Sequence, residues 1–384
     1  MIYKRALKLP PTSFFLFGPR GAGKTTWLKK LLPEAKWFDL LNTKTYFKLL
    51  REPSLLRMEV EALPEGAWIV IDEVQKLTIL LDEVHRLISD YENKYFFALS
   101  GSSARKLKRL DANLLAGRVI NRNFFPMTGT ELNFNFDPES LLRYGCLPKV
   151  CAEPDLAIDI LEAYVGNYLK EEIQQEAFVK DFGSFSRFLE IAALCNGQVT
   201  NVSNIARDAG VARPTVQRYF DVLDTTLIGC WLPAWRTRAK VKESAHPKFF
   251  FFDTGVVRAL SGLLRDSVEK SEKGPLLETL VLHELRSAQN NLQVGGKFYY
   301  WRTPSGSEVD FIWTRGKKTV GIEVKSSVQY RREYCKTLKN LIEEGPIQKG
   351  FLVYLGESVL KDGPVSVLPL KKFMAELSAG RIII

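Results

Sequence analysis

A glycine-rich run near the start of the sequence carries the residue types that hold a phosphate chain. The apolar run Phe14–Phe17 leads directly into the pattern G-x-x-x-x-G-K-[ST], and an amphipathic helical stretch follows. Glycines allow a tight turn whose backbone N–H groups point at a phosphate, and the following helix adds its positive N-terminal end. The residues of this predicted loop are Gly18, Pro19, Arg20, Gly21, Ala22, Gly23, Lys24 and Thr25, followed by Thr26.

Two acidic residues further along the chain complete the predicted nucleotide site. The apolar run Trp68–Ile71 ends in Asp72 and Glu73, as expected for a buried parallel strand with acids at its tip. We expect Lys24 to bind the β- and γ-phosphates of ATP and the Thr25 hydroxyl to bind Mg²⁺. Asp72 would hold the same Mg²⁺ through water, and Glu73 would orient the attacking water. The two motifs together predict an ATP-hydrolysing site.

The next strand-like run ends in small polar residues. The segment YFFALS leads into Gly101, Ser102 and Ser103. An Asp-Glu pair at one strand tip, with a polar residue at the tip of the next strand, resembles the AAA+ ATPases. The resemblance implies that Ser102 senses the γ-phosphate, with Ser103 as the fallback.

Further segments extend this resemblance. The run from Leu115 to Arg118 resembles the segment that holds a trans-acting arginine in one prokaryotic AAA+ family, so Arg118 is the candidate arginine finger. The alternative is that Arg118, like Arg122, is a basic surface residue. An arginine supplied in trans implies a homo-oligomer, and we expect a ring. Gly145 to Pro148 resembles a turn by which relatives touch the base from a lid domain, although a plain helix break explains it equally well.

A pair of helices in the middle of the chain resembles a helix–turn–helix. A short helix from Ser203 ends at Gly210, and Pro214 suits the first turn of the next helix. The apolar residues of that second helix recur at i, i+3, i+4 and i+7, which gives one buried face. The strand-like run and basic residues that follow resemble the wing of a winged helix, which would touch phosphates. The candidate nucleic-acid-binding residues are Arg213, Thr215, Gln217, Arg218, Arg236 and Arg238, with Lys240 and Lys242 nearby. The alternative is a lid or a protein contact.

The last part of the sequence brings carboxylates and a lysine onto neighbouring strands. Glu323 and Lys325 share one face of a strand because side chains alternate with period two, and an adjacent strand could place Asp310 beside them. Two carboxylates can bind hydrated Mg²⁺ while a lysine positions water. Glu278 on the preceding helix is a further candidate ligand. The alternative is a buried ion network in a domain kept for binding or assembly.

This order of helices, strands and charged residues resembles the PD-(D/E)XK nuclease fold. The whole chain resembles a large family of bacterial and archaeal AAA+ ATPases whose C-terminal domain has no known function. The predicted fold class is therefore α/β, with an AAA+ P-loop parallel sheet and a helical lid, then a winged-helix module and a C-terminal α/β nuclease-like domain. The predicted boundaries are 1–135, 136–182, 183–245 and 246–384.

Bulk composition agrees with a basic globular protein. There are 54 lysine and arginine residues against 44 acidic ones, a net charge of +10 that favours a polyanionic partner, DNA more than RNA. The five scattered cysteines lack metal-ligand spacing and are typical of thiols in a reducing compartment. We find neither a signal peptide nor an apolar run that could span a membrane, so we expect a cytoplasmic protein without membrane partners.

The leading hypothesis is an ATPase that uses ATP and Mg²⁺ to bind, remodel or process nucleic acid, with metal-dependent cleavage by the C-terminal domain left open. A second hypothesis is a nucleotide-dependent switch or scaffold that recruits a protein partner. A third is a DNA-binding regulator that uses the winged helix. Nucleic-acid-stimulated ATP turnover separates the first from the others.

Overall fold

The computed structural model describes residues 3–92, 94–102, 115, 117–169, 181–236 and 246–383. It divides into two compact units. One unit comprises residues 7–126 with 225–227, and we call it the N-terminal unit. The other comprises residues 1–6, 127–224 and 228–384, and we call it the C-terminal unit. The predicted division into four domains remains a prediction.

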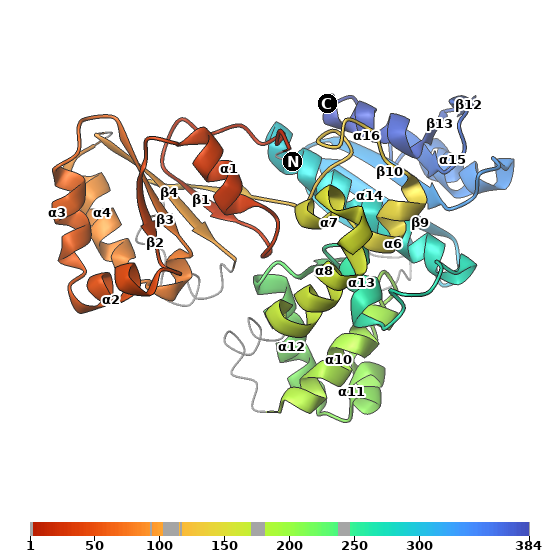
Figure 1. The fold of residues 1–384 in the computed structure, drawn as a ribbon. Coiled ribbons are helices and arrows are strands. Elements are labelled where there is room, and N and C mark those ends of the chain that lie inside the picture. The colour runs from red at the N-terminus through yellow and green to blue at the C-terminus, as the bar shows by residue number, and fades with distance from the viewer. Residues whose placement is uncertain are drawn as a thin grey trace. The chain divides into compact units, whose positions relative to one another are not determined.

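The N-terminal unit contains a parallel five-stranded sheet in the order β2-β3-β4-β1-β5 (Figure 1). Its strands are β1 (Phe14–Phe17), β2 (Lys36–Asp39), β3 (Ala67–Asp72), β4 (Tyr95–Gly101) and β5 (Ile120–Asn123). Its helices are α1 (Lys24–Leu31), α2 (Thr43–Arg51), α3 (Ser54–Glu61), the 3₁₀ turn η1 (Val74–Lys76) and α4 (Leu80–Asp90). Because all five strands are parallel, their carboxyl ends lie along one edge.

Both faces of this sheet are covered, as a parallel sheet requires. Phe14 and Leu16 pack on the side of α1, whereas Phe15 and Phe17 pack on the side of α2, α3 and α4. Figure 1 shows this three-layer arrangement. The uninterrupted apolar runs of β1, β3 and β4 are therefore explained by burial on both faces.

The C-terminal unit begins with helices. They are α6 (Pro138–Tyr144), α7 (Pro148–Ala152), the 3₁₀ turn η3 (Pro154–Leu156), α8 (Ala157–Ala163), the π-helix η4 (Tyr164–Leu169), α10 (Phe182–Leu194), α11 (Val202–Ala209) and α12 (Arg213–Thr225). A two-stranded antiparallel sheet follows, made of β6 (Gly229–Leu232) and β7 (Lys248–Phe251). Aromatic side chains from α10, α12 and β7 join these elements, since Phe188 and Phe249 both pack against Phe220.

A six-stranded mixed sheet forms the rest of the C-terminal unit, in the order β12-β13-β11-β10-β9-β8. The strands are β8 (Lys297–Arg302), β9 (Glu308–Arg315), β10 (Lys318–Lys325), β11 (Lys349–Tyr354), β12 (Leu360–Asp362) and β13 (Val365–Pro369). The helices are α13 (Thr254–Leu260), α14 (Lys270–Leu292), η5 (Arg332–Cys335), α15 (Lys336–Glu343) and α16 (Leu370–Ser378). One core lies between the sheet and α14 with α16, and a second lies between the sheet and α15.

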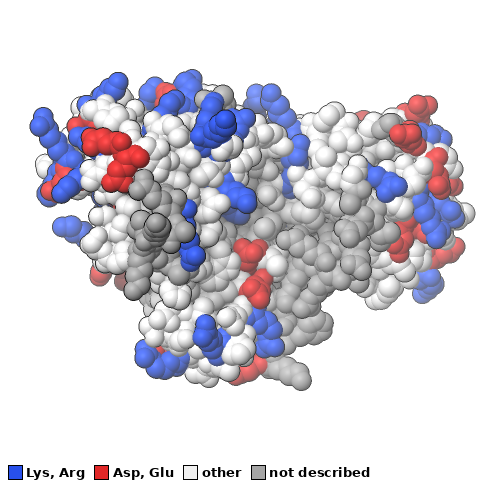
Figure 2. Space-filling view, turned by 180° about the vertical axis from the view of Figure 1, so that it is seen from behind, with Lys and Arg blue, Asp and Glu red and all other residues white. Residues whose placement is uncertain are grey.

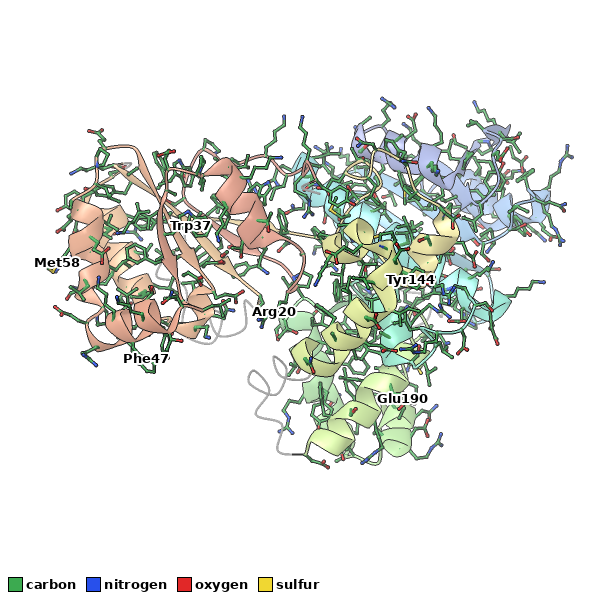
Figure 3. The ribbon with its side chains drawn as sticks, viewed as in Figure 1. Arg20, Trp37, Phe47, Met58, Tyr144 and Glu190 are labelled. Carbon is green, nitrogen blue, oxygen red and sulfur yellow. The ribbon has the colours of Figure 1, made fainter. Side chains whose placement is uncertain are left out.

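The turn at Gly145 bears on one of the sequence expectations. Gly145 ends α6 with a positive φ of 75°, and an added Cβ there would lie 2.0 Å from Asp253 Oδ1. The break between α6 and α7 therefore has a packing reason, and Gly145 also lines a cavity of about 790 Å³ together with Tyr144, labelled in Figure 3. Base contact by this turn remains a prediction.

All five cysteines are free thiols, of which two are buried and three half-buried. Among the described helices, none combines the length and the apolar character needed to cross a membrane.

Candidate nucleotide site and the C-terminal charge cluster

The loop between β1 and α1 has the backbone of a phosphate cradle. Gly21 and Gly23 have φ values of 78° and 94°, a region that side chains disfavour. An added Cβ at Gly18 would lie 2.1 Å from the carbonyl oxygen of Phe124, so this position tolerates no side chain. Arg20 lies at the tip of the loop (Figure 3). The first turn of α1 contains no acidic residue, which leaves its positive end available to an anion.

Lys24 begins α1 and turns back over the loop. Its side chain is buried, and its Nζ donates to the carbonyl oxygens of Gly18 at 2.6 Å and Pro19 at 3.2 Å. The ammonium group is thereby held inside the loop that the sequence assigns to phosphate. These are interactions that phosphate oxygens can replace, because both partners are neutral carbonyls.

Asp72 lies beside Thr25 at the carboxyl edge of the sheet. The Thr25 hydroxyl donates to Asp72 Oδ2 at 2.7 Å, and the Ser100 hydroxyl donates to Asp72 Oδ1. Asp72 and Ser100 are both buried. Two hydroxyl donors thus fix the carboxylate against the start of α1, where the predicted Mg²⁺ would need it.

Glu73 follows in a left-handed conformation, with φ 59° and ψ 44°. For a residue other than glycine this conformation costs about 1 kcal/mol and is concentrated at functional sites. Gln75 Nε2 donates to the Glu73 carboxylate and, at 3.0 Å, to the Ser102 hydroxyl. Glu73 and Ser102, two of the predicted catalytic residues, therefore contact one buried glutamine. Ser103 lies outside the described residues.

The residues present fit a magnesium–nucleotide complex. The loop offers backbone donors, a positive helix end and an ammonium group for phosphates. A threonine hydroxyl and a carboxylate, already in contact at 2.7 Å, offer the hard oxygen donors that Mg²⁺ prefers.

Comparison with known families agrees with this geometry. Residues 11–133 match the family model described as an AAA domain. The N-terminal unit thus contains an AAA-type ATPase domain. Residues 136–267 and 273–373 match two further family models, each described as a domain of unknown function (DUF8612 and DUF4143).

Two mycobacterial relatives match most of the chain. They are the uncharacterized proteins Mb2031c of Mycobacterium bovis and Rv2008c of Mycobacterium tuberculosis. Each is 26% identical over 360 residues, which is 92% of this chain and 78% of the relative. The similarity therefore spans the AAA domain and both domains of unknown function.

Solved structures give only weak overall similarity. A single-residue variant of RuvB from Thermotoga maritima has a TM-score of 0.33 and 16% identity over 58% of this chain and 82% of its own. The ORC1 protein of Aeropyrum pernix, solved in complex with DNA, has a TM-score of 0.31 and 13% identity over 66% and 87%. Protein VC1899 of Vibrio cholerae has a TM-score of 0.22 and 12% identity over 96% of both chains. Scores this low do not establish a shared overall fold.

Arg118, the predicted arginine finger, lies in the AAA domain just before β5. It is exposed, and its backbone N–H donates to the carbonyl oxygen of Leu115 at 3.1 Å. Arg122 lies on β5 and is only half-exposed. The exposure of Arg118 is compatible with both a finger and a surface residue, so its role remains a prediction.

The predicted helix pair of the winged-helix candidate is confirmed as α11 and α12. Gly210 ends α11 with a φ of 68°, and the side chains at the apolar positions of α12 are buried. Of the candidate nucleic-acid contacts, Thr215 is half-buried, whereas Arg213, Gln217, Arg218 and Arg236 are exposed. Arg238, Lys240 and Lys242 lie outside the described residues. DNA binding by these elements remains a prediction.

The C-terminal unit brings six charged residues together, which we call the charge cluster. Asp310 and Glu323 lie on the neighbouring strands β9 and β10, and Asp310 Oδ2 accepts the Val324 N–H at 2.7 Å. Lys325 Nζ lies 2.5 Å from Glu323 Oε1, as the period-two spacing predicts. The members of the cluster are Lys248, Glu278, Glu308, Asp310, Glu323 and Lys325.

Burial shifts the acid–base properties of this cluster. It raises the pKa of Glu278 to about 8, with the neighbouring Asp310 adding to the effect. The pKa of Glu323 is raised well above its usual range by burial and by Asp310. Burial alone would lower the pKa of Lys248, but Glu278, Asp310 and Glu308 raise it above its ordinary value. The two lysines therefore remain charged at neutral pH.

The predicted metal ligands do not fit a divalent ion in this arrangement. Among the described residues, no three histidine, cysteine or acidic side chains come together as a metal-binding group. Lys248 engages Glu278 and Glu308, and Lys325 engages Glu323. The sequence interpretation missed Lys248 because only tertiary structure brings the start of β7 beside α14 and β9.

Proposed function

We propose that this protein hydrolyses ATP in its AAA domain and couples turnover to binding or remodelling of nucleic acid, DNA more than RNA. The observation that carries the ATPase part is the contact of Asp72 with both Thr25 and Ser100 beside the phosphate cradle. An acid at the tip of a parallel strand is common by itself. An acid held by two hydroxyl donors beside a glycine-rich loop is suited to bind magnesium and phosphate together.

Each side chain then has a definite role. Lys24 binds the β- and γ-phosphate oxygens in place of the loop carbonyls that it contacts here. Thr25 would bind Mg²⁺ through its hydroxyl and Asp72 would hold the ion through water, and the bound ion would neutralise charge on the phosphates. Glu73 orients the attacking water, and Ser102 senses the γ-phosphate.

We propose further that the protein acts as a homo-oligomer in which Arg118 reaches a neighbouring site. The AAA domain exposes large apolar side chains on α2 and α3, including Phe47 at 55% and Met58 at 58% exposure. Both point away from the sheet (Figure 3). Exposed apolar side chains that form one continuous patch are typical of surfaces that bind another protein. We propose that these side chains belong to such a surface.

Mixing inactive variants tests the arginine finger. Arg118→Ala and Glu73→Gln are each expected to lose turnover, and mixing them should restore part of it at interfaces that combine an intact Glu73 with a neighbouring Arg118. If the mixture is as inactive as its components, Arg118 does not act in trans.

Support for nucleic-acid binding comes from α12 and the net charge. Arg213 and Arg218 are exposed on the second helix of a helix–turn–helix pair, which is the position that enters a major groove. Figure 2 shows lysine and arginine side chains scattered over one face among acidic ones, rather than gathered in one stripe. The charge alone therefore defines no binding track, and the proposal depends on α12.

ATP turnover with and without DNA or RNA tests this part. We expect DNA to stimulate turnover, with stimulation that falls steeply as salt increases. The double variant Arg213→Ala/Arg218→Ala should lose the stimulation but keep basal turnover. The matched control is Arg86→Ala/Lys361→Ala, which removes two exposed cations elsewhere. Turnover that ignores nucleic acid, with no detectable binding, would contradict the proposal.

A nucleotide-dependent scaffold that recruits a protein partner is the second candidate. It is favoured by the charge cluster, whose carboxylates are engaged by the protein's own lysines. Metal-dependent cleavage is not included in the proposed function for the same reason. A scaffold would show ATP-dependent partner binding with turnover that is insensitive to nucleic acid, whereas a regulator would discriminate strongly between DNA sequences.

A further inference from the structure

Lys248 is the one member of the charge cluster that comes from outside the large sheet and α14. It begins β7, the strand that pairs with β6 next to the helix–turn–helix pair. Its side chain is only 5% exposed, so the ammonium group has lost most of its hydration. A buried lysine needs nearby negative charge to compensate for lost hydration. The cluster supplies that charge.

The ammonium nitrogen of Lys248 lies between carboxylates from two different elements. It is 2.7 Å from Glu308 Oε1 on β9 and 3.3 Å from Glu278 Oε2 on α14. It also lies 5.3 Å from the ring centroid of Tyr300, which faces it from β8. In a metal-dependent site, a divalent cation would lie between the carboxylates of the helix and the strand. Here a lysine occupies that position.

The remaining carboxylates are also engaged. Glu323 Oε1 contacts Lys325, and Asp310 Oδ2 accepts a backbone N–H. Mg²⁺ requires oxygen ligands in near-octahedral geometry at about 2 Å. The carboxylate oxygens that already contact a lysine or a backbone N–H are not free to act as such ligands. Glu323 Oε2 is buried without a hydrogen-bond partner among the described residues. It is therefore the oxygen of Glu323 that a metal ion could bind without displacing a partner.

We propose that Lys248 is the resident cation of the charge cluster and takes the place of a divalent metal. The C-terminal domain then needs no metal ion to fold or to function, and its cluster does not cleave phosphodiesters by metal catalysis. Because Lys248 belongs to β7, the same contact fastens the sheet to the segment that carries the helix–turn–helix pair. The proposal is independent of whether the AAA domain hydrolyses ATP.

Manganese binding without nucleotide tests the proposal, measured by loss of the free Mn²⁺ signal in electron paramagnetic resonance. All proteins carry Asp72→Asn, so that the AAA domain contributes no site. The parent should show no saturable site below about 1 mM, and adding Lys248→Met should create one site that binds at least about tenfold tighter. Adding Glu308→Gln to that variant should remove the new site.

The matched control is Lys339→Met, which removes a lysine that pairs with Asp362 at 2.6 Å on the same unit. It should bind no Mn²⁺. A new site in Lys248→Met that Glu308→Gln leaves intact would overturn the proposal, as would the absence of any new site in a Lys248→Met protein whose circular dichroism is native.

A second measurement does not depend on the folding of a variant. The unsubstituted protein and the Asp310→Asn variant should bind the same amount of Mn²⁺. The unsubstituted protein should also not nick supercoiled DNA in Mg²⁺. Mn²⁺ binding or DNA nicking that is lost in Asp310→Asn would show that a metal displaces Lys248. Either result would overturn the proposal.

Discussion

Gln75 donates a hydrogen bond from its side-chain amide to the hydroxyl oxygen of Ser102, 3.0 Å away. The same amide nitrogen donates to the Glu73 carboxylate. Two residues earlier on β4, Ser100 holds Asp72. Ser100 on β4 therefore contacts Asp72, the last residue of β3, directly. Ser102, just after β4, is linked through Gln75 to Glu73, just after β3. This arrangement follows from the strand order, because β4 lies between β3 and β1.

Gln75→Ala should lower kcat while leaving nucleotide affinity nearly unchanged. The substitution removes the contact that positions Glu73, and misplacing a catalytic group typically costs about tenfold to a hundredfold in rate. Steady-state kinetics and nucleotide binding, measured separately, give the two quantities. Gln198→Ala, which alters an exposed glutamine in the other unit, is the control. A loss confined to affinity would mean that Gln75 does not act through Glu73.

Ser100→Ala should raise the Mg²⁺ concentration needed for half-maximal turnover. Removing this hydroxyl leaves Asp72 Oδ1 buried without its donor and frees the carboxylate to move away from Thr25. Ser102→Ala should lower kcat without this change, since Ser102 contacts Gln75 rather than Asp72. Magnesium titrations of turnover compare the two variants, and equal magnesium requirements would contradict the distinction.

Gly18→Ala should abolish nucleotide binding or unfold the loop, because its Cβ would lie 2.1 Å from a backbone oxygen of Phe124. A backbone atom cannot yield as the end of a flexible side chain can. The control is Gly166→Ala, where an added Cβ meets nothing within 4 Å. Thermal unfolding and nucleotide binding should be unchanged in the control. A Gly18→Ala protein with native affinity would show that the loop is looser than the structure indicates.

Glu284→Gln should stabilise the protein at high pH more than at low pH. Burial raises the pKa of Glu284 to about 8, so the folded state keeps a proton that the unfolded chain releases near its ordinary pKa. This contribution to stability is present below about pH 4 and is lost as the pH rises through about 8. Glutamine stays neutral throughout and can still accept the Gly129 N–H, which lies 2.7 Å from Glu284 Oε1.

Unfolding curves at about pH 6 and about pH 9 measure the free energy of unfolding of the variant and of the unsubstituted protein. The variant's advantage in this free energy should increase by about 1 kcal/mol or more between the two pH values. Glu333→Gln, at an exposed position, should show no such growth. A constant difference between the two pH values would contradict a buried, protonated Glu284.

The sequence predicts the interior of this fold better than its edges. β1, β3 and β4 are uninterrupted apolar runs because the sheet is covered on both faces. β2 and β5 were not predicted, since each has four residues, half of them or more polar or charged, and lies at a sheet edge. β12, β13 and α16 were missed as well. The missed strands β2, β5, β12 and β13 have three to five residues, which carry too little periodicity to be recognised.

The candidate sites divide in the same way. The phosphate loop and the acids of β3 follow from local spacing, and the structure brings Thr25 and Asp72 into contact. Gln75, Ser100 and Lys248 were missed because only tertiary structure gives them their partners. A signal was nevertheless present: Ser100 is a polar residue inside an apolar strand, and Lys248 opens an otherwise aromatic one. Polar residues in such runs need buried partners.

The ATPase site is tested most directly by equilibrium binding and hydrolysis of ATP. The purified protein and Lys24→Ala are compared with and without Mg²⁺. We expect saturable binding below about 1 mM and slow Mg²⁺-dependent release of phosphate, both lost in the variant. Lys29→Ala, which alters an exposed lysine of the same helix, should behave like the unsubstituted protein. An unsubstituted protein that neither binds nor hydrolyses ATP, or a Lys24→Ala protein that does both normally, would contradict the central claim.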